Sequence, residues 1–277
     1  MDDILPPIIQ PEELVLAKAE NIILIDASAG PEAYSNYREA HLDRAIFIGT
    51  ENLAAKPNDP AIGGRHPLPD LRDFSNFLGN IGIAPDSHVI IYDDKNGSNA
   101  SARLWWMLRG VGHLNVQVLN GGLPAAVKAG YAVSDAVSKI NTLSPYPVSG
   151  WQLPVASMGD VRKASIEGGT IIDVRDKARY DGITEPIDLI AGHIPGAINI
   201  PFSTNLDDNG FFLSPAVLHE KYKKYITSSD NAIVHCGSGI TACHTLLAID
   251  YAGLPIPKLY VGSWSEWSRN EITAVRQ

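Results

Sequence analysis

The sequence predicts an α/β protein made of two similar domains, each a mainly parallel β-sheet flanked by helices. Short apolar runs of strand length alternate along the chain with longer stretches of helical periodicity, which is typical of parallel sheets covered by helices. The same order of short motifs also occurs twice, in residues 22–122 and again in residues 170–263. A length of 277 residues fits two domains of ordinary size.

The repeated motifs keep one order in both copies. The corresponding runs are 22–28 with 170–175, 41–45 with 193–197, 89–93 with 232–236, and 119–122 with 260–263. Helical stretches lie between them, such as 69–80 and 214–226. We therefore expect a first domain over residues 1–132 and a second over 156–277. Residues 133–155 hold three prolines among serines and predict an irregular linker.

Composition and charge exclude several classes of protein. Nearly half of the residues are apolar, which is typical of a globular protein with packed cores. The net charge of −9 argues against nucleic acid or an anionic membrane as a partner. No apolar run approaches the length of a membrane span. The acidic start, Met1-Asp2-Asp3, lacks the basic region of a signal peptide, and two cysteines suit a reducing compartment. We therefore expect a cytoplasmic protein.

Cys236 begins the most informative segment, the loop of residues 236–241 with the sequence CGSGIT. A short apolar run that predicts a strand precedes this loop, and a predicted helix, residues 240–251, overlaps its end. A cysteine between a strand end and a helix start faces the positive end of the helix dipole and unpaired N–H groups, and both favour the thiolate. The two glycines of the loop permit a tight turn that aims N–H groups at an anion. The sequence therefore predicts a nucleophilic cysteine, against the alternative of a buried structural one.

The helix after the loop is predicted to be amphipathic. Thr241, His244 and Thr245 form a narrow polar stripe along it, with apolar residues opposite. Cys243 lies two turns beyond Cys236 on this helix. We expect Cys243 to be a core residue, with redox pairing to Cys236 as the alternative.

The first copy carries a different loop at the corresponding position. Where the second copy has Cys236, the first has Asp93, followed by Asp94. A carboxylate has no sulfur chemistry, and two carboxylates would repel an anion. We therefore predict that the first domain is catalytically silent in its own loop. Its role is either to bury one face of the second domain or to shape the active-site cleft.

These motifs resemble the rhodanese superfamily, and specifically its two-domain sulfurtransferases. The resemblance covers nearly the entire chain and depends on the joint order of motifs that are individually weak. The motifs are CGSGIT at 236–241, GHIPGAINIP at 192–201, GSWSEW at 262–267, RLWW at 103–106 and GRHPLP at 64–69. The resemblance implies tandem rhodanese-like domains, of which the second is catalytic. The loop is more similar to the mercaptopyruvate sulfurtransferase version than to the thiosulfate version, which carries basic residues after the cysteine.

The resemblance implies sulfur transfer through a cysteine persulfide. The Cys236 thiolate would attack the sulfane sulfur of a small anionic donor, 3-mercaptopyruvate or thiosulfate, which leaves as pyruvate enolate or sulfite. The persulfide sulfur would then pass to a thiol acceptor such as thioredoxin or glutathione, or to cyanide. No cofactor is expected. No metal ion is expected either, because neither cysteine belongs to a zinc-type pair and the histidines are scattered.

The resemblance also assigns roles to individual residues. Ser238, His66 and Glu51 would assist Cys236 in proton transfer, with Glu51 where the family has an aspartate. Substrate binding would fall to Arg179, Gly237, Gly239, Ile240 and Thr241. The alternatives are that His66 is structural and that the two loop hydroxyls cap the helix.

One departure from the family pattern concerns the second cation for the donor. A guanidinium matches a carboxylate best. The family's second arginine follows a Glu-Pro pair, but this chain has Ile187 there. The departure weakens the expected preference for mercaptopyruvate, with Arg65 or Arg103 as candidate replacements. Arg175 is expected to pair with nearby acidic groups instead.

The sequence bears on three alternative functions. Phosphatases that share this fold have an arginine six residues after the cysteine, and Ala242 at that position argues against phosphatase activity. A thiosulfate-preferring enzyme remains open. A persulfide carrier that serves a partner protein without turning over a small molecule also remains open, because it would share the loop.

Overall fold

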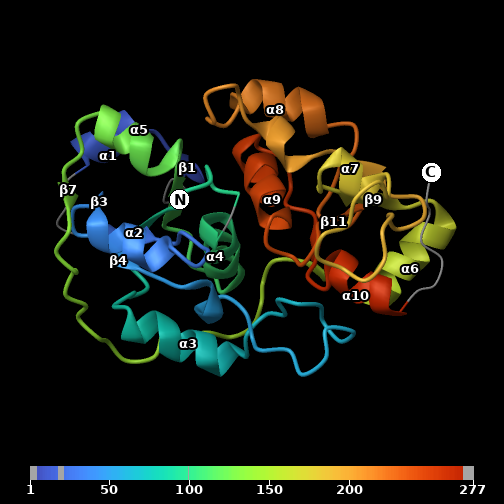
Figure 1. The fold of residues 1–277 in the computed structure, drawn as a ribbon, viewed down its shortest axis with the longest axis horizontal. Helices are drawn as coiled ribbons and strands as arrows, with labels where there is room; N and C mark the ends of the chain where they lie inside the picture. Colours follow the sequence, from blue (N-terminus) through green and yellow to red (C-terminus); the bar gives the residue numbers. More distant parts are fainter. Residues whose placement is uncertain (1–4, 18–21, 99, 271–277) are drawn as a thin grey trace. The chain divides into compact units, whose positions relative to one another are not determined.

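The computed structural model describes residues 5–17, 22–98 and 100–270, so the acidic start of the chain lies outside the described residues. The chain divides into two compact units. Unit 1 comprises Met1–Leu53, Pro69–Gln152 and Asn209–Phe211, and unit 2 comprises Ala54–Leu68, Leu153–Asp208 and Phe212–Gln277. Unit 2 therefore includes a segment, 54–68, that lies in the first half of the sequence. Figure 1 shows the elements of both units in chain order.

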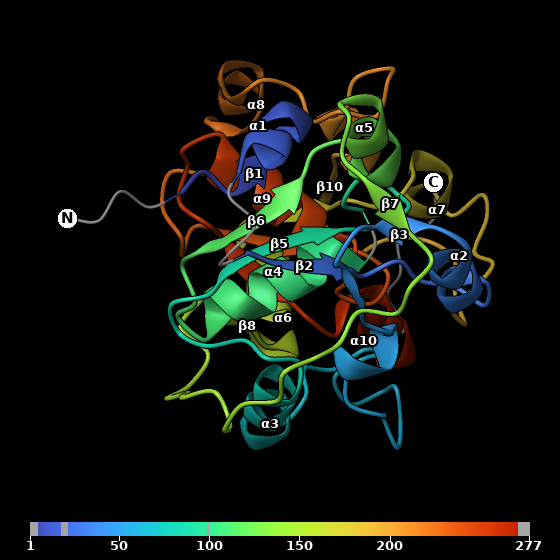
Figure 2. The same cartoon turned by 90° about the vertical axis from the view of Figure 1, so that its left-hand side faces the viewer.

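Unit 1 is built on a parallel sheet. Its described strands, in spatial order, are β1 (Ile8–Ile9), β6 (Val116–Leu119), β5 (His88–Tyr92), β2 (Ile22–Asp26) and β4 (Ile46–Phe47). The helices are α1 (Pro11–Leu16), α2 (Ala33–Glu39), η2 (Thr50–Asn52), α3 (Leu71–Asn80), α4 (Ala100–Gly110) and α5 (Gly122–Lys128). A short antiparallel pair joins β3 (His41–Leu42) to β7 (Val133–Ser134). Figure 2 shows α1 and α5 on one side of the sheet and α3 and α4 on the other.

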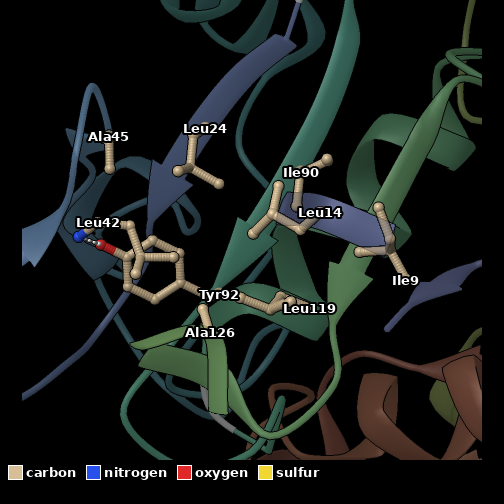
Figure 3. Packing of buried hydrophobic residues seen from close by; sticks show 9 residues of the cluster. All are labelled: Ile9, Leu14, Leu24, Leu42, Ala45, Ile90, Tyr92, Leu119 and Ala126. Carbon is tan, nitrogen blue, oxygen red and sulfur yellow. Dashed lines mark hydrogen bonds between the residues drawn. The ribbon is translucent and has the colours of Figure 1, made fainter. Parts of the chain in front are cut away.

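One face of this sheet packs against α1 and α5 (Figure 3). Leu24 of β2 and Ile90 of β5 point into this core together with Leu14 of α1 and Ala126 of α5. The tyrosine hydroxyl of Tyr92 accepts a hydrogen bond from the Leu42 backbone N–H at 3.2 Å. Because side chains alternate between the faces of a strand, the largely apolar central strands bury both faces under helices, as parallel sheets require.

Unit 2 repeats the same strand order. Its described strands are β8 (Val155–Ala156), β12 (Lys258–Tyr260), β11 (Ala232–His235), β9 (Thr170–Asp173) and β10 (Ile198–Asn199), and all adjacent pairs are parallel. The helices are α6 (Met158–Glu167), α7 (Lys177–Tyr180), η3 (Phe202–Asn205), α8 (Pro215–Tyr222), α9 (Ala242–Tyr251) and α10 (Ser263–Asn270). The predicted α/β fold, a mainly parallel sheet flanked by helices in each copy, is confirmed.

Helix α9 differs from the prediction. It begins at Ala242 rather than residue 240, and residues 242–249 are all buried. His244 and Thr245, expected on a polar stripe, are fully buried, and the His244 ring stacks on Phe212 with centroids 4.5 Å apart. The prediction of an amphipathic helix was wrong, because α9 packs against the sheet on one side and against α8 and η3 on others.

Residues 135–154, all of them described, contain neither helix nor strand, and β7 and β8 lie at their two ends. In the described part of the chain we find no helix with the length and hydrophobicity needed to span a bilayer.

Candidate active site

Cys236 lies where β11 ends, at the carboxyl edge of the unit 2 sheet, which is the usual position of ligand sites in parallel α/β sheets. Its side chain is 2% exposed, and the Gly239 backbone N–H donates to Sγ at 3.2 Å. Gly239 has φ +79°, and a Cβ there would lie 2.5 Å from the Val261 carbonyl oxygen. Only glycine fits this position, so the N–H that faces the sulfur depends on Gly239. Gly237, by contrast, lies outside the left-handed region.

The turn between β12 and α10 is hydrogen-bonded to the backbone of Cys236. The Ser263 hydroxyl accepts from the Cys236 N–H at 3.2 Å and donates to the Tyr260 carbonyl at 2.9 Å. The Trp264 N–H donates to the Cys236 carbonyl at 3.0 Å. Ser263 is fully buried with φ 52°. Sequence analysis missed this residue, although it belongs to the GSWSEW motif that carried part of the resemblance.

His66 and Ser238 meet within unit 2. His66 Nδ1 lies 2.8 Å from Ser238 Oγ, and the serine is buried. The segment that carries His66 is tied to the β12–α10 turn, because the Arg65 N–H donates to Ser265 Oγ at 3.1 Å and the Gly63 N–H to Glu266 Oε1 at 2.7 Å. The structure therefore places a histidine from residue 66 beside the loop of residue 236.

Cys236 lines a cavity of about 140 Å³. Its lining residues come from the loop, α7 and nearby segments of unit 2: Arg65, Arg175, Asp176, Arg179, Ile187, Phe202, Cys236, Gly237, Ser238 and Thr241. Three of these side chains are guanidinium groups, which makes this a small cavity suited to an anion. Ile187, found where the family has an arginine, lines the cavity without contributing charge.

Asp188 forms ion pairs with three arginines, two of which line this cavity. Its side chain is fully buried and forms ion pairs with Arg65, with Arg179 at 3.5 Å and with Arg269 at 3.1 Å. Arg179 also pairs with Glu185 at 2.7 Å. Sequence analysis assigned no role to Asp188, since an acidic residue near an anion site gives no signal by itself.

A second ion pair lies at the ends of the central strands. Arg175 Nη2 lies 2.6 Å from Asp173 Oδ2, and both side chains are buried, as expected for Arg175. His235 Nε2 lies 3.7 Å from the same carboxylate oxygen. Burial lowers the pKa of His235 below its ordinary 6.5. Burial alone would raise the pKa of Asp173, but His235 and Arg175 hold it below 3.8. Asp173 is therefore ionised and His235 neutral at physiological pH.

Glu51 and Arg103 belong to unit 1. Glu51 lies against Gly49 and lines a cavity of about 370 Å³ there, together with Tyr34 and Phe47. Arg103 is fully buried and donates from Nε to the Leu53 carbonyl at 3.4 Å. Its burial in the unit 1 core leaves it no surface for a donor, so of the two candidate replacements only Arg65 lines the Cys236 cavity.

The remaining loop residues are also placed. Thr241 lines the cavity and makes no side-chain cap hydrogen bond to α9, so the expected capping alternative is not seen at this residue. Ile240 is half-buried in the loop. Cys243 is a free, fully buried thiol whose Sγ lies 3.4 Å from the Gly239 carbonyl, which confirms it as a core residue. The described residues contain no group of three or more His, Cys, Asp and Glu arranged to hold a metal ion.

Comparison with known proteins identifies the family to which this fold and loop belong. The model of the rhodanese-like domain matches the chain twice, over residues 11–129 and 157–270. A protein of Pseudomonas aeruginosa named probable 3-mercaptopyruvate sulfurtransferase is 38% identical over 236 residues, covering 83% of this chain and 82% of that protein. The thiosulfate sulfurtransferase of Rattus norvegicus is 34% identical over 250 residues, covering 86% of this chain and 80% of that protein.

A solved structure agrees with these relatives. The crystal structure of SseA from Escherichia coli, described with the rhodanese fold of 3-mercaptopyruvate sulfotransferases, is similar with a TM-score of 0.76 and 30% identity, covering 95% of this chain and 100% of that chain. The chain therefore belongs to the rhodanese-like domain family, of which it contains two copies. It is a sulfurtransferase enzyme, the activity that these relatives share in their names.

Proposed function

We propose that this sulfurtransferase takes sulfur from a small anionic donor onto Cys236 as a persulfide and passes it to a thiol or to cyanide. The observation that carries the proposal is the hydrogen bond from the Gly239 N–H to Cys236 Sγ at the mouth of a cavity lined by arginines. An N–H aimed at sulfur stabilises the thiolate that attacks and the persulfide that replaces it. The arginines supply the charge that an anionic donor needs.

The first step is nucleophilic displacement on sulfur. With 3-mercaptopyruvate as donor, the Cys236 thiolate forms a sulfur–sulfur bond, and the donor's carbon–sulfur bond breaks with its electron pair leaving as pyruvate enolate. Ser238 and His66, 2.8 Å apart, relay the donor's thiol proton to the enolate. Glu51 is proposed to assist this transfer. In the second step an acceptor thiolate attacks the outer sulfur and regenerates the Cys236 thiolate.

We propose 3-mercaptopyruvate as the better donor. The loop side chains after Cys236 are uncharged, so the loop itself offers no cation to the two negative charges of thiosulfate. Arg179, whose Nη atoms lie about 3.4 Å from the Cβ position of Gly237, is proposed to bind the donor's carboxylate, and Gly237, Gly239, Ile240 and Thr241 to surround the transferred sulfur. A preference of about tenfold in kcat/KM corresponds to ~1.4 kcal/mol of transition-state stabilisation. A thiosulfate preference would overturn the argument from the loop.

The test follows the persulfide directly. The purified protein is incubated with 3-mercaptopyruvate or thiosulfate, and intact-mass spectrometry measures the addition of one sulfur atom, with Cys243→Ser as the matched control for the second thiol. We expect the added sulfur in the wild type and in Cys243→Ser and none in Cys236→Ser. Persulfide formation only from a partner protein, with no turnover of either donor, would favour the persulfide carrier instead.

The cellular setting is part of the proposal. The acceptors are proposed to be thioredoxin, glutathione or cyanide, and the protein is proposed to act in the cytoplasm without nucleic acid or membrane partners. The first domain, residues 1–132, is proposed to be catalytically silent in its own loop, with residues 133–155 as linker and residues 156–277 as the catalytic domain.

A further inference from the structure

We infer that Arg65 is the second cation of the donor site. It replaces the family's second arginine, at whose position this chain has Ile187. The inference rests on the proposed function, because it assigns a specificity-determining residue to that same cavity. Ile187 lines the cavity as an uncharged side chain, and Arg65 lines it as a charged one. The cation is therefore delivered from a different part of the sequence, the 54–68 segment that belongs to unit 2.

Arg65 and Arg179 converge on one point of the cysteine loop. A Cβ built on Gly237 would lie 3.4 Å from both Nη atoms of Arg179 and 3.5 Å from Arg65 Nη2. Gly237 directly follows the nucleophile, so two guanidinium groups flank the chain one residue from Sγ. Gly237 has no left-handed φ, so its backbone conformation does not require glycine. A side chain at this residue would occupy the space between the two guanidinium groups, and glycine leaves that space open to a ligand.

Asp188 binds one nitrogen of the Arg65 guanidinium and leaves another directed at the cysteine loop. The Asp188 carboxylate accepts from Arg65 Nη1, while Nη2 is the atom that approaches Gly237. One fully buried carboxylate is shared by Arg65, Arg179 and Arg269, so this group of four side chains carries two positive charges in excess. Glu185 offsets one of these through Arg179. Within these five side chains one positive charge remains. Arg175 is matched by Asp173, and Asp176 also lines the cavity, so a donor carboxylate would be bound by its direct contacts with Arg65 and Arg179 and not by a net positive charge.

The backbone around Arg65 holds it in this place. The Arg65 N–H donates to Ser265 Oγ, and the preceding Gly64 has φ +79°, where a Cβ would lie 2.4 Å from the Gly262 carbonyl oxygen. A side chain at residue 64 would collide with that carbonyl. The glycine therefore lets the chain approach the β12–α10 turn closely enough for the Arg65 side chain to reach the cavity.

The structure supplies a matched control for the experiment. Arg269 pairs with the same Asp188 oxygen as Arg65 and has a similar exposed fraction, 15% against 21%. Arg269 is not among the residues that line the cavity. If Arg65 acts only by neutralising Asp188, then Arg65→Gln and Arg269→Gln should have the same effect. If Arg65 binds the donor, only Arg65→Gln should weaken binding.

The experiment measures kcat and KM for 3-mercaptopyruvate and the inhibition constant of pyruvate, a carboxylate without transferable sulfur. We expect Arg65→Gln to raise KM and the inhibition constant by tenfold or more with kcat changed less than threefold. Arg269→Gln should change each by less than twofold. Arg65→Lys should fall between, because lysine keeps the charge but not the planar pair of donors.

Equal effects of Arg65→Gln and Arg269→Gln, or an unchanged KM in Arg65→Gln, would overturn the inference. Thermal unfolding of each variant accompanies the kinetics, and Arg65→Lys provides the second variant should Arg65→Gln fail to fold. Failure of the proposed function looks different: the wild type itself would then transfer no sulfur from the donor.

Discussion

The two copies of the fold carry different side chains, with different hydrogen bonds, in the loop after the central strand. In unit 1 the side chain after the central strand is Asp93, whose Oδ1 accepts from the N–H groups of Lys95 and Gly97, each at 2.9 Å, while Oδ2 accepts from the Ser101 hydroxyl at 2.6 Å. In unit 2 the corresponding side chain is Cys236, and an N–H from the loop meets its sulfur. In unit 1 the N–H groups of the turn are therefore bound by the carboxylate of Asp93, whereas in unit 2 the turn borders a cavity lined by arginines.

The neighbouring strand ends differ in the same way. Asp26 and Asp173 end the corresponding strands β2 and β9, and each accepts from the N–H two residues on. Burial raises the pKa of Asp26, whose neighbour is Ser28, but the pKa of Asp173 is held low where Arg175 replaces that serine. His235 and the Arg175 guanidinium, at the positions that correspond to Tyr92 and Ser28, thus keep the pKa of this strand-end carboxyl low despite its burial. The strand end of β9 in unit 2 thus holds a buried ion pair, Asp173 with Arg175, where the strand end of β2 in unit 1 has Asp26 beside Ser28.

The largest expected effect comes from giving residue 236 the side chain that unit 1 has at the corresponding position, Asp93. Cys236→Asp copies the unit 1 arrangement, so its carboxylate should accept the loop N–H groups and occupy the donor site. We expect a folded protein with no measurable sulfur transfer, as in Cys236→Ser, because neither oxygen nucleophile can form a persulfide. Steady-state turnover and circular dichroism check this. Activity near wild type in either variant would remove Cys236 from the mechanism.

The next prediction exchanges the strand-end carboxyls for amides. Asp173→Asn leaves the Arg175 guanidinium, 2% exposed, with the longer 3.3 Å contact to Glu185 in place of its 2.6 Å ion pair, and should lower the free energy of unfolding by ~3 kcal/mol. Asp26→Asn keeps an acceptor for the Ser28 N–H. Since a raised pKa means that folding favours the protonated carboxyl, stability from Asp26 is lost as pH rises through its folded pKa.

Asp26→Asn should therefore keep or raise the free energy of unfolding at pH 7. Urea unfolding of both variants at that pH provides the comparison. A loss in Asp26→Asn as large as that in Asp173→Asn would show that the two strand ends are electrostatically equivalent.

A smaller effect separates the two proposed proton-transfer residues outside the loop. His66 lies 2.8 Å from the loop hydroxyl of Ser238 within unit 2, whereas Glu51 belongs to unit 1. His66→Asn should lower kcat for 3-mercaptopyruvate about 100-fold, the low end of general acid–base contributions. Glu51→Gln should lower it by less. Initial rates over a pH range decide the order, and a larger loss in Glu51→Gln would move the proton relay away from His66.

The sequence predicted the fold well because duplication and apolar periodicity are local signals. Strands such as β9 and β11 followed from short apolar runs, and Cys236 was evident from its glycines. What could not be predicted depended on tertiary packing. The burial of His244 comes from elements that pack around α9, and a polar residue in a helix gives no sign of them.

The site shows the same division. The sequence pointed to the loop and to His66, but it left Arg65 and Arg103 as equal candidates for the missing cation. Arg65 reaches the cavity because the 54–68 segment folds with unit 2, whereas Arg103 is buried in unit 1. Asp188 was not predicted at all, because two of its three arginine partners, Arg65 and Arg269, are distant in sequence.

The smallest predicted effect concerns pH. His235 and Tyr92 occupy corresponding strand ends, and burial lowers the pKa of the histidine and raises that of the tyrosine. Tyr92 therefore stays neutral at mild acidity in both the folded and unfolded chain. His235 is neutral when folded, but below about pH 6.5 the unfolded chain binds the proton, so stability must fall as pH falls.

One such proton changes the free energy of unfolding by up to ~1.4 kcal/mol per pH unit. His235→Gln keeps a polar group near the Cys236 carbonyl, which lies 3.1 Å from His235 Nδ1, but cannot bind the proton. Urea unfolding between pH 7 and pH 5 should therefore show a shallower loss in His235→Gln than in the wild type. Other groups that titrate in this range contribute equally to both proteins, so the difference in slope belongs to residue 235. Identical slopes would mean that His235 is protonated in the folded chain, where its Nε2 would then form a charged pair with Asp173 across the present 3.7 Å.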